Sequence, residues 1–107
     1  MNNREITSLM HRLFYGDLGP ADYVHFMVDE KLDRIRVNSL LGRFIPGDEF
    51  LIYANSSHCA LSSRSGAFEH SDRLMQLGRV KIADPRFEGR VIIEPSGVGA
   101  GQRVTDR

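Results

Sequence analysis

The sequence predicts a single α+β domain, in which an N-terminal helix precedes a curved, mostly antiparallel sheet or partial β-barrel. Three observations predict this class. An amphipathic stripe lies near the N-terminus, short apolar runs alternate with turn signals from residue 49 onward, and a chain of 107 residues suits one modest core. We place the domain at residues 1–95 and expect residues 96–107 to form a flexible, glycine-rich tail.

A first helix is predicted over residues 3–15. Apolar residues recur there at the i, i+3, i+4, i+7 and i+8 spacing of a helix with one buried face: Ile6, Leu9, Met10, Leu13 and Phe14. Asn2 or Asn3 can cap the helix, and Glu5 in its first turn complements the helix dipole.

Two patterns are mixed between residues 21 and 41. A short helix over residues 21–31 is favoured because proline suits a first helical position, although the apolar residues that alternate there are also compatible with a strand: Val24, Phe26 and Val28. Residues 32–38 are predicted as a strand, because two sets of residues alternate with a period of two: Leu32, Arg34 and Arg36 against Asp33, Ile35 and Val37. One helix from Ala21 to Leu41 is the remaining alternative.

The second half of the chain predicts strands separated by turns. Pro46-Gly47-Asp48 is a turn signal, and the aromatic and branched residues 49–54 indicate a strand. The serine-rich residues 55–71 lack periodicity and are expected to be a long surface loop. Ser71 could then cap one helical turn that ends at Gly78, followed by two strands, at residues 79–83 and 89–94, around the turn at residues 84–86.

The segment from Tyr23 to Tyr53 carries a family resemblance. A lysine (Lys31), an arginine (Arg36) and a later Gly47-Asp48 before an apolar strand resemble the ASCH domains, a branch of the PUA-like β-barrels, over about residues 20–83. The enzymatic members, amidohydrolases acting on acetylated cytidine, place a threonine three residues after the lysine. This chain has Arg34 there, and no later carboxylate matches the family's catalytic glutamate. The resemblance therefore implies a binding barrel more than an enzyme.

Four cations form the predicted ligand site: Lys31, Arg34, Arg36 and Arg43. On a strand, Arg34 and Arg36 would project from one face about 7 Å apart, and guanidinium groups suit phosphates, carboxylates and stacked bases. The competing interpretation is a solvated face neutralised by the neighbouring acids, namely Asp29, Glu30 and Asp33. Because the formal net charge is zero, affinity for nucleic acid has to come from such a local patch.

Other chemical motifs are incomplete. His58-Cys59 has no second ligand pair at metal spacing, His70-Ser71-Asp72 lacks a nucleophile elbow, and Gly97–Gly101 lacks the following helix of a phosphate loop. We predict no catalytic residues, no metal and no cofactor. A single cysteine and the absence of a long apolar run favour a cytoplasmic protein without membrane contact.

The predicted function is a small non-enzymatic binding module for RNA, a nucleotide or another anion, with residues 55–65 as a lid. One alternative is a small NTF2-like enzyme, a cone-shaped α+β fold with an apolar pocket, using His25 or His58 with Asp29. Another is a protein-binding accessory factor. A homodimer through the first helix or an edge strand is a further expectation, because so small a sheet would leave apolar surface on that helix.

Overall fold

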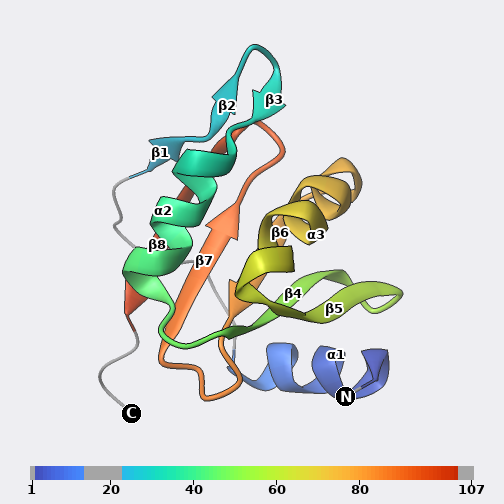
Figure 1. Ribbon diagram of the computed structural model, residues 1–107. Coiled ribbons are helices and arrows are strands. Elements are labelled where there is room, and N and C mark those ends of the chain that lie inside the picture. Colours follow the sequence, from blue (N-terminus) through green and yellow to red (C-terminus); the bar gives the residue numbers. More distant parts are fainter. Residues whose placement is uncertain (1, 14–22, 104–107) are drawn as a thin grey trace.

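A six-stranded antiparallel sheet forms the body of the protein, with helices on both of its faces (Figure 1). The computed structural model describes residues 2–13 and 23–103. The strands lie in the order β1 (Val24–His25), β8 (Val98–Arg103), β7 (Gly89–Ile93), β6 (Val80–Ala83), β4 (Glu49–Asn55) and β5 (His58–Ser63). The predicted α+β class is confirmed, and the sheet is open, since β1 and β5 remain as separate edges.

The first helix, α1 (Asn3–Leu13), is confirmed within the described residues. The Asn2 side chain caps it by accepting a hydrogen bond from the Glu5 backbone N–H at 2.9 Å. Ile6 and Met10 are almost fully buried against the sheet, as the apolar stripe predicts. The expected end of this helix at residues 14 and 15 lies outside the described residues.

The helix and strand predictions over residues 21–38 are both wrong for residues 23–38, and residues 21 and 22 lie outside the described residues. Three two-residue strands occupy the segment predicted as a helix: β1, β2 (Met27–Val28) and β3 (Lys31–Leu32). The last two form a small separate hairpin, whose turn residues Asp29 and Glu30 both have positive φ. Strands so short cannot display a period, so only the weak alternation of the apolar residues indicated them.

Helix α2 (Arg34–Phe44) replaces the predicted strand over residues 32–38, and the alternative helix from Ala21 is also wrong because α2 begins at residue 34. Asp33 caps it, with Oδ2 accepting from the Arg36 N–H at 3.0 Å. The deciding signal is the spacing of three buried residues at i, i+3 and i+4: Val37, Leu40 and Leu41.

The strand prediction at residues 49–54 is confirmed by β4, but the long loop predicted over residues 55–71 is wrong. This segment forms β5, a short 3₁₀ turn at Arg64–Gly66, and the start of helix α3 (Ala67–Leu74). A further 3₁₀ turn at Met75–Leu77 ends at Gly78, whose φ is +133°. Ser71 lies inside α3 and donates a hydrogen bond to the Ala67 carbonyl, so it does not cap a helix.

The hairpin predicted around residues 84–86 is confirmed by β6 and β7. By contrast, the glycine-rich tail is a wrong prediction for residues 98–103, which form β8 between β7 and β1. A Cβ on Gly99 would lie 2.4 Å from the Phe26 ring, and one on Gly101 would lie 2.2 Å from the Phe44 ring. The glycines are therefore packing positions of a strand, since the two rings lie directly on its backbone.

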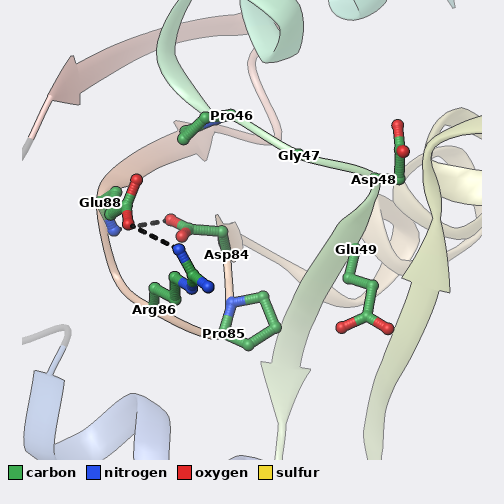
Figure 2. A pocket seen from close by; sticks show the side chains of 8 residues that line it. All are labelled: Pro46, Gly47, Asp48, Glu49, Asp84, Pro85, Arg86 and Glu88. Atoms are coloured by element: carbon green, nitrogen blue, oxygen red, sulfur yellow. Dashed lines mark hydrogen bonds and ion pairs between the residues drawn. The ribbon is translucent and has the colours of Figure 1, made fainter.

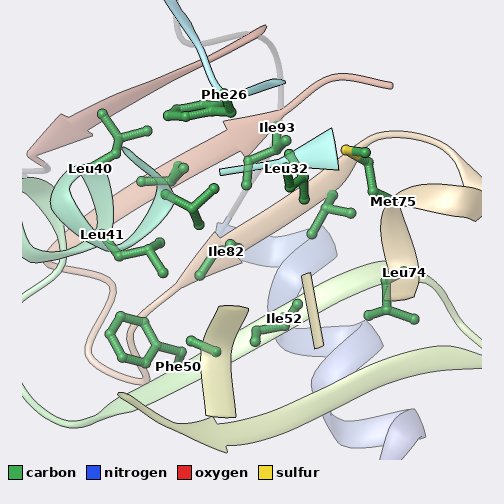
Figure 3. Packing of buried hydrophobic residues seen from close by; sticks show 14 of the residues in the cluster. Phe26, Leu32, Leu40, Leu41, Phe50, Ile52, Leu74, Met75, Ile82 and Ile93 are labelled. Atoms are coloured by element: carbon green, nitrogen blue, oxygen red, sulfur yellow. The ribbon is translucent and has the colours of Figure 1, made fainter. Parts of the chain in front are cut away.

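Two buried clusters lie on opposite faces of the sheet. The larger cluster lies between the sheet, the small hairpin, α2 and α3, with Ile82 near its middle and Phe26 at one end (Figure 3). The smaller cluster joins Ile6 and Met10 of α1 to the other face. Within the described residues, no helix is long and apolar enough to cross a membrane.

Candidate ligand-binding groove

The four predicted cations do not form one cluster. Residues two apart on a helix are rotated by about 200°, so α2 directs Arg34 and Arg36 to nearly opposite sides instead of the common face expected for a strand. Lys31 lies in the separate hairpin and is exposed.

Arg34 is engaged with α3. Its Nη2 donates to Glu69 Oε1 at 2.6 Å, and its guanidinium lies 4.5 Å from the centre of the Phe68 ring. The hydrogen bond from Arg34 is the largest influence that lowers the pKa of the Glu69 carboxyl below its ordinary value. This arginine therefore joins two helices, and its charge is compensated.

Arg36 and Arg43 line one open groove of about 300 Å³ between β1 and α2. The remaining lining residues are mostly apolar: Val24, Phe26, Ile35, Ser39 and Leu40. The two arginines are seven residues apart, which corresponds to about 10 Å along a helix. Ser39 and Leu40 lie between them on the same side, so two cations flank an apolar and hydroxyl-bearing floor.

Within residues 2–13 and 23–103, the charges of these two arginines are only weakly compensated. Arg36 Nε lies 4.0 Å from Asp33 Oδ2, and its Nη1 donates to the His25 carbonyl at 3.2 Å. Arg43 lies 5.1 Å from the centre of the Phe44 ring and forms no ion pair with another described residue. A guanidinium has five N–H donors, so each keeps donors for a ligand.

A second hollow, of about 250 Å³, lies between the segment before β4 and the β6–β7 turn (Figure 2). It is lined by Pro46, Gly47, Asp48, Glu49, Asp84, Pro85, Arg86 and Glu88. Asp84 is buried, and its Oδ1 accepts from the backbone N–H groups of Glu88 and Gly89 at 2.7 and 2.9 Å. Glu88 faces Arg86 at 3.8 Å. The carboxylates of Asp84 and Glu88 thus stabilise the turn between β6 and β7.

The histidines and the cysteine are placed apart from the groove. His58 Nδ1 lies 3.0 Å from Asn55 Oδ1 in the β4–β5 turn, at the opposite edge of the sheet from β1. Burial raises the pKa of the Cys59 thiol above its ordinary value, and its Sγ donates to the Asn3 carbonyl at 3.8 Å. Nothing orients the two side chains as a nucleophile and its base, and no group of three metal-ligating side chains occurs within residues 2–13 and 23–103.

Residues 55–65, predicted as a lid, lie in β5 and its flanking turns at the far edge of the sheet, so they cannot close over this groove. The apolar lining of the groove was missed because it depends on α2. The helical spacing of the buried residues Val37, Leu40 and Leu41 could have predicted this helix. Ile35, a lining residue of the groove, lies away from that buried face and is 78% exposed.

Comparisons of the chain with protein-family models, with curated proteins and with solved structures found no match. The resemblance to ASCH domains therefore stays a prediction.

Proposed function

We propose that the protein is a non-enzymatic binding module for a nucleotide, free or within single-stranded RNA, and that the groove between β1 and α2 is its site. The observation that carries the proposal is the pair of weakly compensated arginines, Arg36 and Arg43, on either side of an open apolar floor. A nucleotide combines the two chemistries that this groove offers, since phosphate suits guanidinium and the base suits an apolar or aromatic surface.

An exposed aromatic residue one position before the groove residue Val24 supports this ligand class. Tyr23 precedes the groove residue Val24 and is 55% exposed. Bases stack on exposed aromatic rings and on guanidinium planes, and this contact tolerates any base. We therefore expect binding with little sequence preference.

The lining also favours a binder over an enzyme. Among the residues that the structure describes, those lining the groove include neither a carboxylate nor a histidine, and the acid–base pair of His58 with Asp29 is divided between β5 and the β2–β3 hairpin. The pair of His25 with Asp29 would need to act outside the groove lining. The predicted alternative enzyme thus lacks its catalytic groups at this site.

The test measures binding of a mononucleotide and of a uridine oligonucleotide by titration calorimetry. Arg36→Ala combined with Arg43→Ala removes both cations, while Arg4→Ala combined with Arg12→Ala removes the same charge from the exposed side of α1. Charge-assisted hydrogen bonds are worth about 1.5–3 kcal/mol each. We expect the first pair to weaken binding at least about 100-fold and the control pair to change it little.

The two ligands distinguish the two sources of nucleotide. Binding of the oligonucleotide alone indicates RNA, and comparable binding of the mononucleotide indicates a free nucleotide. With two phosphate contacts, the logarithm of the oligonucleotide affinity should fall with the logarithm of salt with a slope of about −1.4. Wild-type affinity in the groove variant, or binding only of an acidic peptide, would overturn the proposal.

A homodimer, the other partner expected from the sequence, remains a proposal as well. It would need a surface other than this groove if both partners are to bind together. The cytoplasmic location stays a prediction.

A further inference from the structure

The edge of the sheet opposite the groove pairs with no further strand in the described part of the chain. β5 is hydrogen-bonded to β4 and is the last strand of the sheet among the described residues (Figure 1). The Arg64 N–H donates to the Asp48 carbonyl at 3.0 Å, and this bond fixes the alternation of the ladder. Bonded pairs recur at every second position of an antiparallel ladder, so the outward N–H and C=O groups belong to Cys59, Leu61 and Ser63.

Apart from an irregular pairing at its start, between Tyr53 and Asn55 of β4, this edge lacks the features that usually prevent strands from associating. Natural edge strands are kept short, or they carry charges, prolines or bulges that block pairing. β5 has six residues, and none of them is a proline, lysine, arginine, aspartate or glutamate. The opposite edge, β1, has only two residues, and its His25 carbonyl already accepts a hydrogen bond from Arg36.

We propose that two copies of this protein pair through antiparallel β5 strands, around a two-fold axis that passes through Leu61. In this register Leu61 faces Leu61 of the second copy, and Cys59 faces Ser63. The Ser63 carbonyl already accepts a hydrogen bond from Ser62 Oγ at 2.9 Å and would use its second lone pair for the partner strand. All three outward residues then exchange hydrogen bonds, about six in total. A centre at Ala60 would pair only Cys59 with Leu61, so the centre at Leu61 satisfies more of the edge.

The side chains of β5 fit a second copy better than a partner of different sequence. Leu61 is 40% exposed on the α1 face of the sheet, and its cross-strand neighbour in β4 is the buried Leu51. The two-fold register therefore buries one exposed leucine against another. The strand carries no lysine, arginine, aspartate or glutamate that would select an acidic or basic partner, and no such residues meet at the axis when it pairs with itself.

The proposed pairing also joins the two sheets into one continuous sheet across the two-fold axis. Residues opposite one another in an antiparallel pair project from the same face, so both Leu61 side chains lie on the face that carries α1. The two sheets would become one sheet, with α1 of each copy on the same side. The β1–α2 grooves would lie at its two outer edges, where each remains open.

Sedimentation equilibrium of three variants tests the proposal. Leu61→Lys and Leu61→Glu each put like charges opposite one another at the axis, so each should weaken dimerisation at least 10-fold, with an unchanged circular dichroism spectrum. An equimolar mixture of the two should restore a dimer, because lysine then faces glutamate. Leu77→Lys places the same substitution at another exposed leucine, outside the sheet, and should dimerise like wild type.

A wild-type protein that stays monomeric at several hundred micromolar would overturn the proposal. So would a Leu61→Lys variant that dimerises like wild type, because the axis would then lie elsewhere. A mixture that stays monomeric would equally contradict the register, since charge complementarity at Leu61 is specific to this two-fold arrangement.

Discussion

Replacing Gly99 by alanine is expected to destabilise the protein markedly. A Cβ at this position would lie 2.4 Å from the Ile92 carbonyl oxygen and 2.4 Å from Cε2 of Phe26, whose side chain is fully buried. The backbone oxygen belongs to the neighbouring strand and cannot move away cheaply. Overpacking of this kind costs about 1–3 kcal/mol, which outweighs the gain of about 0.4–1 kcal/mol from a less flexible unfolded chain.

Urea denaturation followed by circular dichroism measures this loss. A fall in the free energy of unfolding by about 2 kcal/mol corresponds to a lower Tm by about 10 °C for a domain of this size. Gly42→Ala is the matched control, because this glycine lies inside α2 and the nearest atom to its added Cβ is 3.7 Å away. It should stabilise the helix by up to about 1 kcal/mol. A Gly99→Ala protein as stable as wild type would refute the packing of Phe26 against β8.

Two further predictions concern buried and paired carboxylates. Asp84→Ala should lower the free energy of unfolding by about 3 kcal/mol, because two backbone N–H groups lose their acceptor. Asp84→Asn keeps an acceptor oxygen and should lower it less. Equal losses for the two variants in urea denaturation would argue against this role of Asp84. The depressed pKa of Glu69 contributes stability above the carboxyl's unfolded-state pKa, and this contribution is lost as the pH falls through the folded-state pKa. Arg34→Met should therefore raise the Glu69 pKa towards its ordinary value in an NMR titration, and an unchanged pKa would show that the Arg34 contact does not cause the depression.

The elements that were predicted correctly are indicated by patterns among residues close together in the sequence. α1 repeats its apolar residues at helical spacing, and β4 is a continuous run of aromatic and branched residues. The hairpin of β6 and β7 is marked by Asp84-Pro85-Arg86 between two apolar runs. In each case the pattern extends over enough residues to distinguish a helix from a strand.

The elements that were missed depend on distant contacts. Two of the six residues of β8 are glycines, and they are explained only by the rings of Phe26 and Phe44 that lie on them. β5 is an edge strand of small, mostly polar residues, which resembles a loop in sequence because one side of it is open. Local propensity is weak at such positions, so pairing with a neighbouring strand decides the structure.

The candidate site was predicted in part. Arg36 and Arg43 line one groove. Arg34 was grouped with them because the segment was interpreted as a strand. On a helix, Arg34 projects from a different side and pairs with Glu69 instead. The Asp33 cap and the spacing of Val37, Leu40 and Leu41 were present in the sequence and would have corrected the period. The ion pair of Arg34 with Glu69 spans 35 positions of the chain and has no local signal.

An NMR titration of the ¹⁵N-labelled protein with a uridine oligonucleotide locates ligand binding directly. We expect saturable shifts of the backbone amides of Val24, Ser39 and Leu40 around the groove, and the same amides should stay unshifted in the Arg36→Ala and Arg43→Ala double variant. Shifts confined to other surfaces, or none at millimolar ligand, would contradict a nucleotide site between β1 and α2.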